Sequence, residues 1–284
     1  ATALISAGDE VLNVAGVDIV TASDTSVNAN IGGDLAGFTA EIEFDVVDNA
    51  AGLIAEMGGA DVAGHLTEAN SITVDDTRTG SVVNANDGAI LAGFTADVGF
   101  DVVDDADAIA LEVAGASNSG DELNSVDANG VINTVVVSGG DVDATEAGVI
   151  QSISGYVGTA SDYDITDTAT ALISAGDEVL NVAGVDIVTA SDTSVNANIG
   201  GDLAGFTADI EFDVVDNADA IAIEVAASGT GAGSLDEANN VAVVSGDVTA
   251  SEADAIQDIA KYSGADSDYD ITDNAAALIS AGDE

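Results

Sequence analysis

The chain has 284 residues, of which 53 are acidic and only two, Arg78 and Lys261, are basic, so its formal charge is −51. Phosphate contacts need a footprint of lysine and arginine, so this composition excludes a nucleic-acid partner and argues against an anionic membrane surface. Hydrophobic residues make up 47% of the chain, a fraction typical of globular proteins, so we expect the chain to fold.

Ten short runs of β-branched and aromatic residues predict strands, and an Ala-rich stretch follows most of them. In chain order the strand cores are VDIVTAS, EIEFDVV, SITVD, DVGFDVV, NTVVVS, YDIT, VDIVTAS, DIEFDVV, VAVVS and YDIT, starting near residues 17, 41, 71, 97, 133, 163, 185, 209, 241 and 269. This alternation predicts an α/β repeat fold, a right-handed β/α solenoid with a parallel sheet and about ten coils of 22–36 residues.

The intervening segments are predicted to be helices. Thr249 and Glu252 form a capping-box pattern before an apolar stripe, and Gly264 is the predicted end of that helix. The segments NADAIAIEVAAS, TATALISAG and NAAALISAG have the same pattern, with Asp216, Asp167 and Asp273 at the predicted N-cap positions. The two TSVNANIGGDLAG segments are rich in Asn and Gly, so we expect them to be irregular or a single helical turn.

Internal repeats cover almost the whole chain. Residues 1–50 recur at 169–218 with one change, Glu41 against Asp209, and residues 161–178 recur in close form at 267–284. Because each repeat depends on its neighbours for burial, we expect one continuous solenoid over residues 1–284, with a long sub-repeat at 11–178 and a short one at 179–284.

The two ends of the sequence are in the same phase of the repeat. ATALISAGDE at 1–10 and AAALISAGDE at 275–284 agree in nine of ten positions. The pattern after Glu284 calls for VLNVAG, which is the segment that follows Glu10. We therefore expect head-to-tail joining with further copies of the chain, and we expect the 284 residues to be an excerpt of something longer.

Strand alternation predicts an outward column of carboxylates. Its members are Asp18, Glu43, Asp45, Asp75, Asp101, Asp164, Asp186, Glu211, Asp213 and Asp270. Neighbouring strands lie about 5 Å apart, so carboxylates side by side repel one another. This repulsion requires either bound cations or a high-salt environment that screens it.

The cation hypothesis is that Ca²⁺ bridges carboxylates along the sheet face or at two clusters near strand ends, because Ca²⁺ prefers several hard oxygen ligands. The predicted metal ligands are Asp162, Asp164, Asp167, Asp266, Asp268, Asp270 and Asp273. Residues 266–277 depart from an EF-hand loop at Ile271 and Ala277, where Gly and Glu are required. The alternative interpretation is that these aspartates are helix N-caps and a solvated acidic face.

Few residues suit catalysis. The chain has no cysteine and one histidine, His65, so thiolate ligands, disulfides and most acid–base chemistry near neutral pH are missing. His65 has no second ligand near it in the sequence, and Lys261 is interpreted as a charge at a helix end. No apolar stretch approaches the roughly 18 residues that span a bilayer. We therefore expect no enzymatic activity, no organic cofactor and no membrane insertion.

The segments YDITDTATALISAG, YDITDNAAALISAG and VVSGDVTASEADAIQDIAKYSG resemble the strand–(S/T)DTAxNL–helix repeats of giant, calcium-associated adhesins on bacterial cell surfaces. The resemblance covers about a third of the chain. It implies an extracellular, non-enzymatic role at the cell surface. The phase-matched ends favour a structural filament or surface matrix. The alternative is the stalk or ligand-binding region of an adhesin or surface-layer protein, with a cell-surface or matrix polysaccharide as partner.

Overall fold

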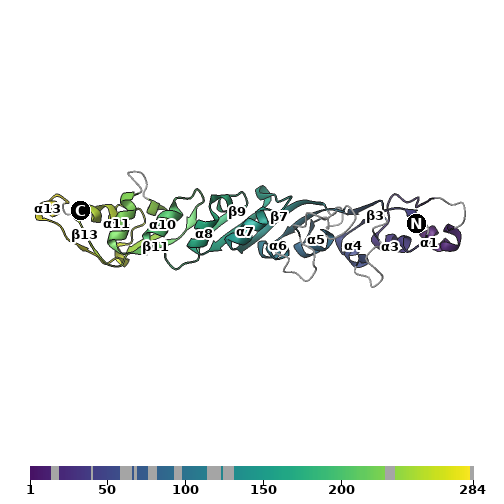
Figure 1. Cartoon of the computed structure of the whole chain (residues 1–284), viewed down its shortest axis with the longest axis horizontal. Coiled ribbons are helices and arrows are strands. Elements are labelled where there is room, and N and C mark those ends of the chain that lie inside the picture. Colours follow the sequence, from purple (N-terminus) through teal and green to yellow (C-terminus); the bar gives the residue numbers. More distant parts are fainter. Residues whose placement is uncertain are drawn as a thin grey trace. The chain divides into compact units, whose positions relative to one another are not determined.

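The computed structural model describes residues 1–13, 19–39, 41–57, 66, 69–75, 82–92, 98–113, 123, 131–227 and 234–281. Short strands alternate with short helices along the described chain (Figure 1). The residues form two compact parts, the first made of residues 1–139 and 149–161 and the second of residues 140–148 and 162–284.

The first part begins with helices and builds a parallel sheet. Its elements are α1 (Thr2–Ala7), α2 (Asp9–Leu12), β1 (Val20–Thr21), α3 (Ala29–Ala36), β2 (Ile42–Glu43), β3 (Asp45–Asp48), α4 (Ala50–Met57), β4 (Ser71–Val74), β5 (Val82–Val83), α5 (Ala85–Ala92), β6 (Val98–Asp104), α6 (Ala106–Val113) and η3 (Gly158–Ala160). Two further elements, β7 (Val131–Val142) and α7 (Ala144–Gln151), contain residues of both parts. The strand order β3-β4-β6-β7 is parallel throughout, β5 also pairs with β6, and β1 pairs with β2.

The second part repeats the same alternation. Its elements are β8 (Asp162–Asp167), α8 (Ala169–Ala175), α9 (Asp177–Leu180), β9 (Val185–Ala190), α10 (Ala197–Ala204), β10 (Ile210–Glu211), β11 (Asp213–Asp216), α11 (Ala218–Ala227), η4 (Ser234–Glu237), β12 (Asn240–Val243), β13 (Asp247–Val248), α12 (Ala250–Gln257), η5 (Gly264–Asp266), β14 (Asp270–Ile271) and α13 (Ala275–Ala281). Parallel pairing joins β8 to β9 to β10, β11 to β12, and β13 to β14.

The predicted α/β fold with a parallel sheet is confirmed. All ten predicted strand cores coincide with strands of the structure. The first was predicted from residue 17, and the part of it that the structure describes, from residue 19, contains β1. Two short strands, β5 and β13, were not predicted. Each has only two residues, which is too short for an alternating or apolar pattern to indicate a strand. No helix in the described residues is both long and apolar enough to cross a membrane.

Two helix predictions were wrong. The Asn- and Gly-rich segments form eight-residue helices, α3 and α10, where irregular structure or a single helical turn was expected. The side chains of Asn28 and Asn196 cap these helices by accepting hydrogen bonds from the third residue of each. The helix predicted to reach Gly264 is α12, which ends at Gln257, although its capping box between Thr249 and Glu252 is present as predicted.

The glycines in these helices let the helix approach the sheet. A Cβ atom placed on Gly200 would lie 2.7 Å from Cγ2 of Val214, 3.2 Å from Cδ2 of Leu235 and 3.4 Å from Cε2 of Phe212. The same Val, Leu and Phe arrangement surrounds Gly32 and Gly88. Phe212 is almost fully buried, as are its counterparts in the other two copies. Close helix packing on a Phe-centred core therefore explains why helix-breaking residues are tolerated here.

Candidate functional site

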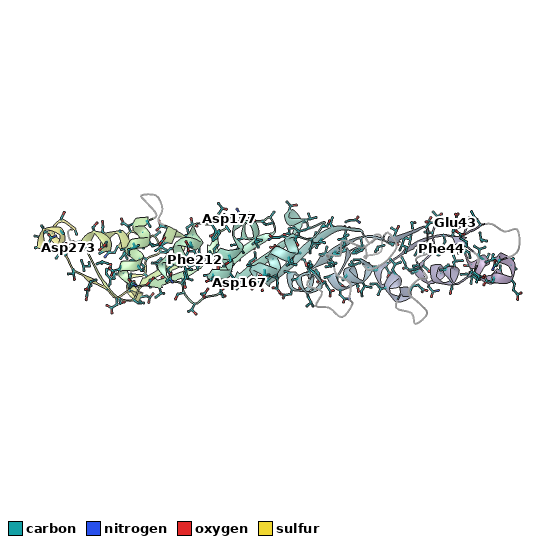
Figure 2. All side chains as sticks on the ribbon, in the orientation of Figure 1. Glu43, Phe44, Asp167, Asp177, Phe212 and Asp273 are labelled. Atoms are coloured by element: carbon teal, nitrogen blue, oxygen red, sulfur yellow. The ribbon has the colours of Figure 1, made fainter. Side chains whose placement is uncertain are left out.

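Aspartates at the ends of strands form the most regular polar feature of the molecule. In six places one carboxylate oxygen of such an aspartate accepts a hydrogen bond from the first amide of the helix in the preceding βα unit. With N···O distances of 2.7 to 3.2 Å, these bonds join Ala29 to Asp48, Ala85 to Asp104, Ala144 to Asp167, Ala169 to Asp192, Ala197 to Asp216, and Ala250 to Asp273. We call the six acceptors the strand-end aspartates; Figure 2 labels two of them, Asp167 and Asp273.

The second oxygen of most strand-end aspartates binds the next residue of its own chain segment. Asp216 Oδ1, for example, accepts from the amide of Asn217 at 2.7 Å and from its side-chain nitrogen at 2.9 Å. These five carboxylates, of Asp48, Asp104, Asp167, Asp216 and Asp273, therefore hold the start of their own helical segment and the start of the preceding helix. A negative charge at a helix N-terminus is favourable, because it satisfies free amides and complements the helix dipole.

The predicted N-cap role of Asp167, Asp216 and Asp273 therefore needs correction. The residue after each aspartate caps the helix that follows; for α8 this is Thr168, whose hydroxyl accepts from the amide of Ala171 at 3.3 Å. The aspartate itself serves the helix of the preceding unit. Sequence periodicity identified a capping residue at these positions, but it could not show which helix is capped, because the acceptor and donor are 19 to 23 residues apart.

A second link joins α9 to the turn after α10. Oδ1 of Asp177 accepts from the amides of Thr207 at 2.9 Å and Ala208 at 3.2 Å, and Asp177 and Asp167 lie toward opposite edges of the ribbon in Figure 2. The pKa of the Asp177 carboxyl lies below its usual value of 3.8. The main cause is a hydrogen bond with the Thr207 side chain, and the hydrogen bonds from the amides of Ala208 and Thr207 add to it. Asp9 accepts from the amide of Thr39 in the first copy of this sequence.

We predict that Asp177→Asn lowers the free energy of unfolding by more at pH 7 than at pH 2. The folded pKa lies below the unfolded value, so the charged carboxylate contributes stability above about pH 4, and this contribution is lost as the pH falls through the folded pKa. Asparagine keeps an acceptor oxygen for Thr207, so the comparison isolates the charge. Urea denaturation at pH 2, 4 and 7 measures the effect. Asp186→Asn, an exposed change on β9, is the control; a loss at pH 2 equal to that at pH 7 would contradict the prediction.

Several of the outward carboxylates face neutral polar residues on the neighbouring strand, where alternation had suggested a column of carboxylates. The register places Asp45 opposite Ser71, Asp101 opposite Thr134, and Asp213 opposite Asn240. The hydroxyls of Ser71 and Thr134 donate to the facing carboxylates at 2.6 Å. In the pair β13–β14 two carboxylates do stand opposite each other, those of Asp247 and Asp270. Polar neutral partners therefore relieve much of the repulsion that the sequence predicted.

The predicted metal ligands have different surroundings. Asp167 and Asp273 are strand-end aspartates, Asp164 Oδ1 accepts from the amide of Ile187 at 3.1 Å, and Asp266 Oδ2 accepts from the Ser263 hydroxyl at 2.7 Å. The other three, Asp162, Asp268 and Asp270, are exposed. In the part of the chain that the structure describes, no group of three or more carboxylate or histidine side chains is placed to hold a metal ion. Calcium binding thus stays a prediction.

The single histidine, the two basic residues and Asp18 complete the set of residues considered from the sequence. His65 and Arg78 lie outside the described residues, as does Asp18 of the predicted outward column. Lys261 is exposed four residues beyond the end of α12, and its carbonyl accepts from the amide of Val241 at 3.0 Å. The placement of Lys261 agrees with its interpretation as a charge near a helix end.

Sequence reasoning missed one buried acid, Glu112 in α6. Its side chain is 4% exposed, and its Oε2 atom has no hydrogen-bond partner. In the equivalent positions, Glu56 and Glu224 lie over glycine; a Cβ on Gly33 would be 1.7 Å from Glu56 Oε1, and one on Gly201 would be 2.0 Å from Glu224 Oε1. Ala89 occupies the matching helix position near Glu112, so its methyl group takes the space that the carboxylate fills elsewhere.

We predict that Glu112→Met raises the free energy of unfolding by about 1 kcal/mol, because it removes a buried carboxylate oxygen that lacks a partner. Glu224→Met is the matched control, since the Glu224 side chain is more exposed and packs over Gly201. Thermal and urea denaturation of both variants measure the difference. An equal gain in the two variants, or a loss in Glu112→Met, would count against the explanation.

The last described βα unit presents a surface that its internal copy buries. Ile165 and Leu172 in β8 and α8 are both 0% exposed, whereas the matching Ile271 and Leu278 in β14 and α13 are 45% and 43% exposed. Ile279 of α13 is 80% exposed. The sequences of the two units are nearly the same, so the difference comes from what covers them. Internally, β9 pairs with β8, and α10 packs on α8.

Comparison with known proteins gives no further assignment. No family model matches the chain, and no significant match is found among the curated proteins or the solved structures.

Proposed function

We propose that this protein is a structural repeat protein that joins to further copies of itself to form filaments or a surface matrix. In this proposal the βα units continue as one right-handed β/α solenoid of about ten coils over residues 1–284. The observation that carries the proposal is the exposed apolar surface of β14 and α13, whose near-identical internal copy is buried by the next βα unit.

Several features support a structural role. The Asp-to-helix bonds recur in unit after unit and place the charge where it stabilises helix starts. Parallel pairing of β13 with β14 leaves the other edge of β14 without a partner strand in the described residues. An unprotected strand edge next to exposed Ile and Leu side chains is a surface that favours further pairing.

An extracellular location is part of the proposal, because the repeats resemble those of bacterial surface proteins. The second candidate is a stalk or ligand-binding region of a large adhesin with a polysaccharide partner. The two differ in self-association: a filament subunit assembles as its own concentration rises, whereas a stalk region stays a single chain. A non-enzymatic role is common to both.

The proposal is tested by sedimentation velocity and negative-stain electron microscopy of the purified chain over a hundredfold range of concentration. We expect the sedimentation coefficient to rise with concentration and uniform filaments to appear at the upper end. A single species with a constant sedimentation coefficient throughout, with no filaments, would overturn the filament proposal in favour of the stalk.

Calcium is the cation that we propose for the exposed or half-exposed carboxylates Asp162, Asp164, Asp266, Asp268 and Asp270. We expect calorimetric heat on Ca²⁺ titration and a melting temperature that falls in EGTA, since bound cations offset part of the charge of −51. Sodium chloride at matched ionic strength is the control. No heat, together with a melting temperature that responds to NaCl alone, would replace calcium with general salt screening.

A further inference from the structure

We propose that two successive helices held by one strand-end aspartate form the cooperative unit of this protein, so that both helices unfold and refold together. We call such a unit a clamped pair. The clamped pairs of the described residues are α3 with α4, α5 with α6, α7 with α8, α10 with α11, and α12 with α13. The inference concerns a single copy of the chain, so it goes beyond the proposed assembly and does not depend on it.

The clamp is a carboxylate that two helix starts share. In the pair α10–α11, Asp216 Oδ2 accepts from the first amide of α10, that of Ala197, at 3.0 Å, and Oδ1 accepts from the amide of Asn217, directly before α11, at 2.7 Å. When either helix unfolds, the carboxylate loses one of its two anchors, so the other helix start loses a fixed, charged acceptor. The same two bonds are made in the other pairs by Asp48, Asp104, Asp167 and Asp273.

Further contacts join the two helices of the α10–α11 pair. The Glu224 side chain of α11 lies over Gly201 of α10, where a Cβ atom would be 2.0 Å from Oε1. Just before α10, the amide of Val195 donates to the carbonyl of Asp213 at 2.8 Å, and the Val195 carbonyl accepts from the amide of Val215 at 2.9 Å. Asp213 and Val215 belong to β11, which leads into α11. The two helices are therefore tied together at their starts and along their surfaces.

The helix starts on either side of a pair boundary are held by different residues. After the α10–α11 pair, the first amide of α11, that of Ala218, donates to the backbone carbonyl of Ser245 at 2.8 Å, while the Thr249 side chain caps α12. Before the pair, Asp192 accepts from the first amide of α8 at 2.7 Å, while Asn196 caps α10. Parallel strands join neighbouring pairs, as β11 and β12 do. Strand pairing and packing thus continue across these boundaries, but the two helix starts there have separate acceptors.

The internal sequence repeats match clamped pairs in register. The repeat of residues 1–50 at 169–218 places the first helix of one pair, α3, on the first helix of another, α10. The repeat of residues 161–178 at 267–284 places α8 on α13, and both are the second helix of their pair. In these repeats a first helix is matched to a first helix and a second helix to a second. This correspondence supports the pair, and not the single βα unit, as the building block.

Native-state hydrogen exchange of the natural chain tests the pairing, at a concentration where sedimentation shows a single species. We expect the slowest amides of α10 and α11 to have protection factors that agree within about threefold and fall equally with added urea. The protection factors of α11 and α12 are expected to differ by about tenfold or more. Unequal protection of α10 and α11, or one common value for all helices, would overturn the clamped pair.

Asp216→Asn tests the clamp itself. Asparagine keeps one acceptor oxygen, but its side-chain nitrogen cannot accept, so this residue no longer holds both helix starts. We expect the protection factors of α10 and α11 to separate by about tenfold or more. Asp192→Asn is the matched control, because it removes the same charge at a pair boundary and keeps an acceptor for the amide of Ala169. Equal protection of α10 and α11 in Asp216→Asn, or their separation in both variants, would contradict the clamp.

The outcomes separate this inference from the filament proposal. Matched protection of α10 and α11 in a chain that never assembles would support the clamped pair and overturn the filament. Filaments formed by a chain in which α10 and α11 exchange independently would do the opposite.

Discussion

Asp216→Ala is expected to lower the free energy of unfolding by about 3 kcal/mol. The carboxylate accepts from the amide of Ala197 at 3.0 Å, from the amide of Asn217 at 2.7 Å and from the side chain of Asn217. Alanine would leave the starts of α10 and α11 without this acceptor. Each lost cap costs about 1 kcal/mol, and bonds to a charged acceptor are worth more than neutral ones.

Urea denaturation at pH 7 measures this loss. Glu211→Ala is the control, because Glu211 is an exposed acid on the neighbouring strand β10 and its removal relieves the same amount of charge. We expect the control to change the free energy of unfolding by less than about 0.5 kcal/mol. Equal effects of the two substitutions would show that Asp216 acts through net charge and not through the helix starts.

Gly200→Ala is expected to lower the free energy of unfolding by about 2 kcal/mol, although alanine is the better helix former. The new Cβ atom would lie 2.7 Å from Val214, closer than carbon atoms approach in folded proteins, so α10 has to move off the Phe212 core. The penalty for overpacking outweighs the gain in helix propensity of about 1 kcal/mol.

Gly148→Ala in α7 is the matched control. Its nearest neighbour would be Cγ2 of Val179 at 3.6 Å, an ordinary contact, so only the propensity term remains. We expect this variant to be more stable by about 1 kcal/mol. The opposite signs of the two Gly→Ala substitutions are the diagnostic result, and a gain in both would contradict the close approach of α10 to the sheet.

Strand positions and the parallel α/β pattern could be predicted from the sequence because they follow from local alternation. Ile210, Phe212 and Val214 are buried, and Glu211 between them is exposed, as a period of two requires. The helices α3 and α10 could not be predicted in the same way. Their glycines lower helix propensity, and the compensating contact with Val214 and Leu235 is made through tertiary packing.

The polar site was predicted in part. Aspartates at strand ends were identified as caps or ligands, but the helix that each one caps belongs to the preceding unit, which only the pairing of successive units reveals. The outward carboxylates were expected to face one another because alternation gives the face of a residue and not its register. The register sets Ser71 and Thr134 opposite two of them.

The most direct measurement is amide hydrogen exchange of residues 268–281 and 162–175 in the natural chain as its concentration rises. These two nearly identical segments differ in burial, so the first is expected to exchange faster in the dilute protein. When copies assemble, exchange in residues 268–281 is predicted to slow to the rate of residues 162–175. Exchange in residues 268–281 that stays fast at every concentration would contradict the proposal that a second copy covers β14 and α13.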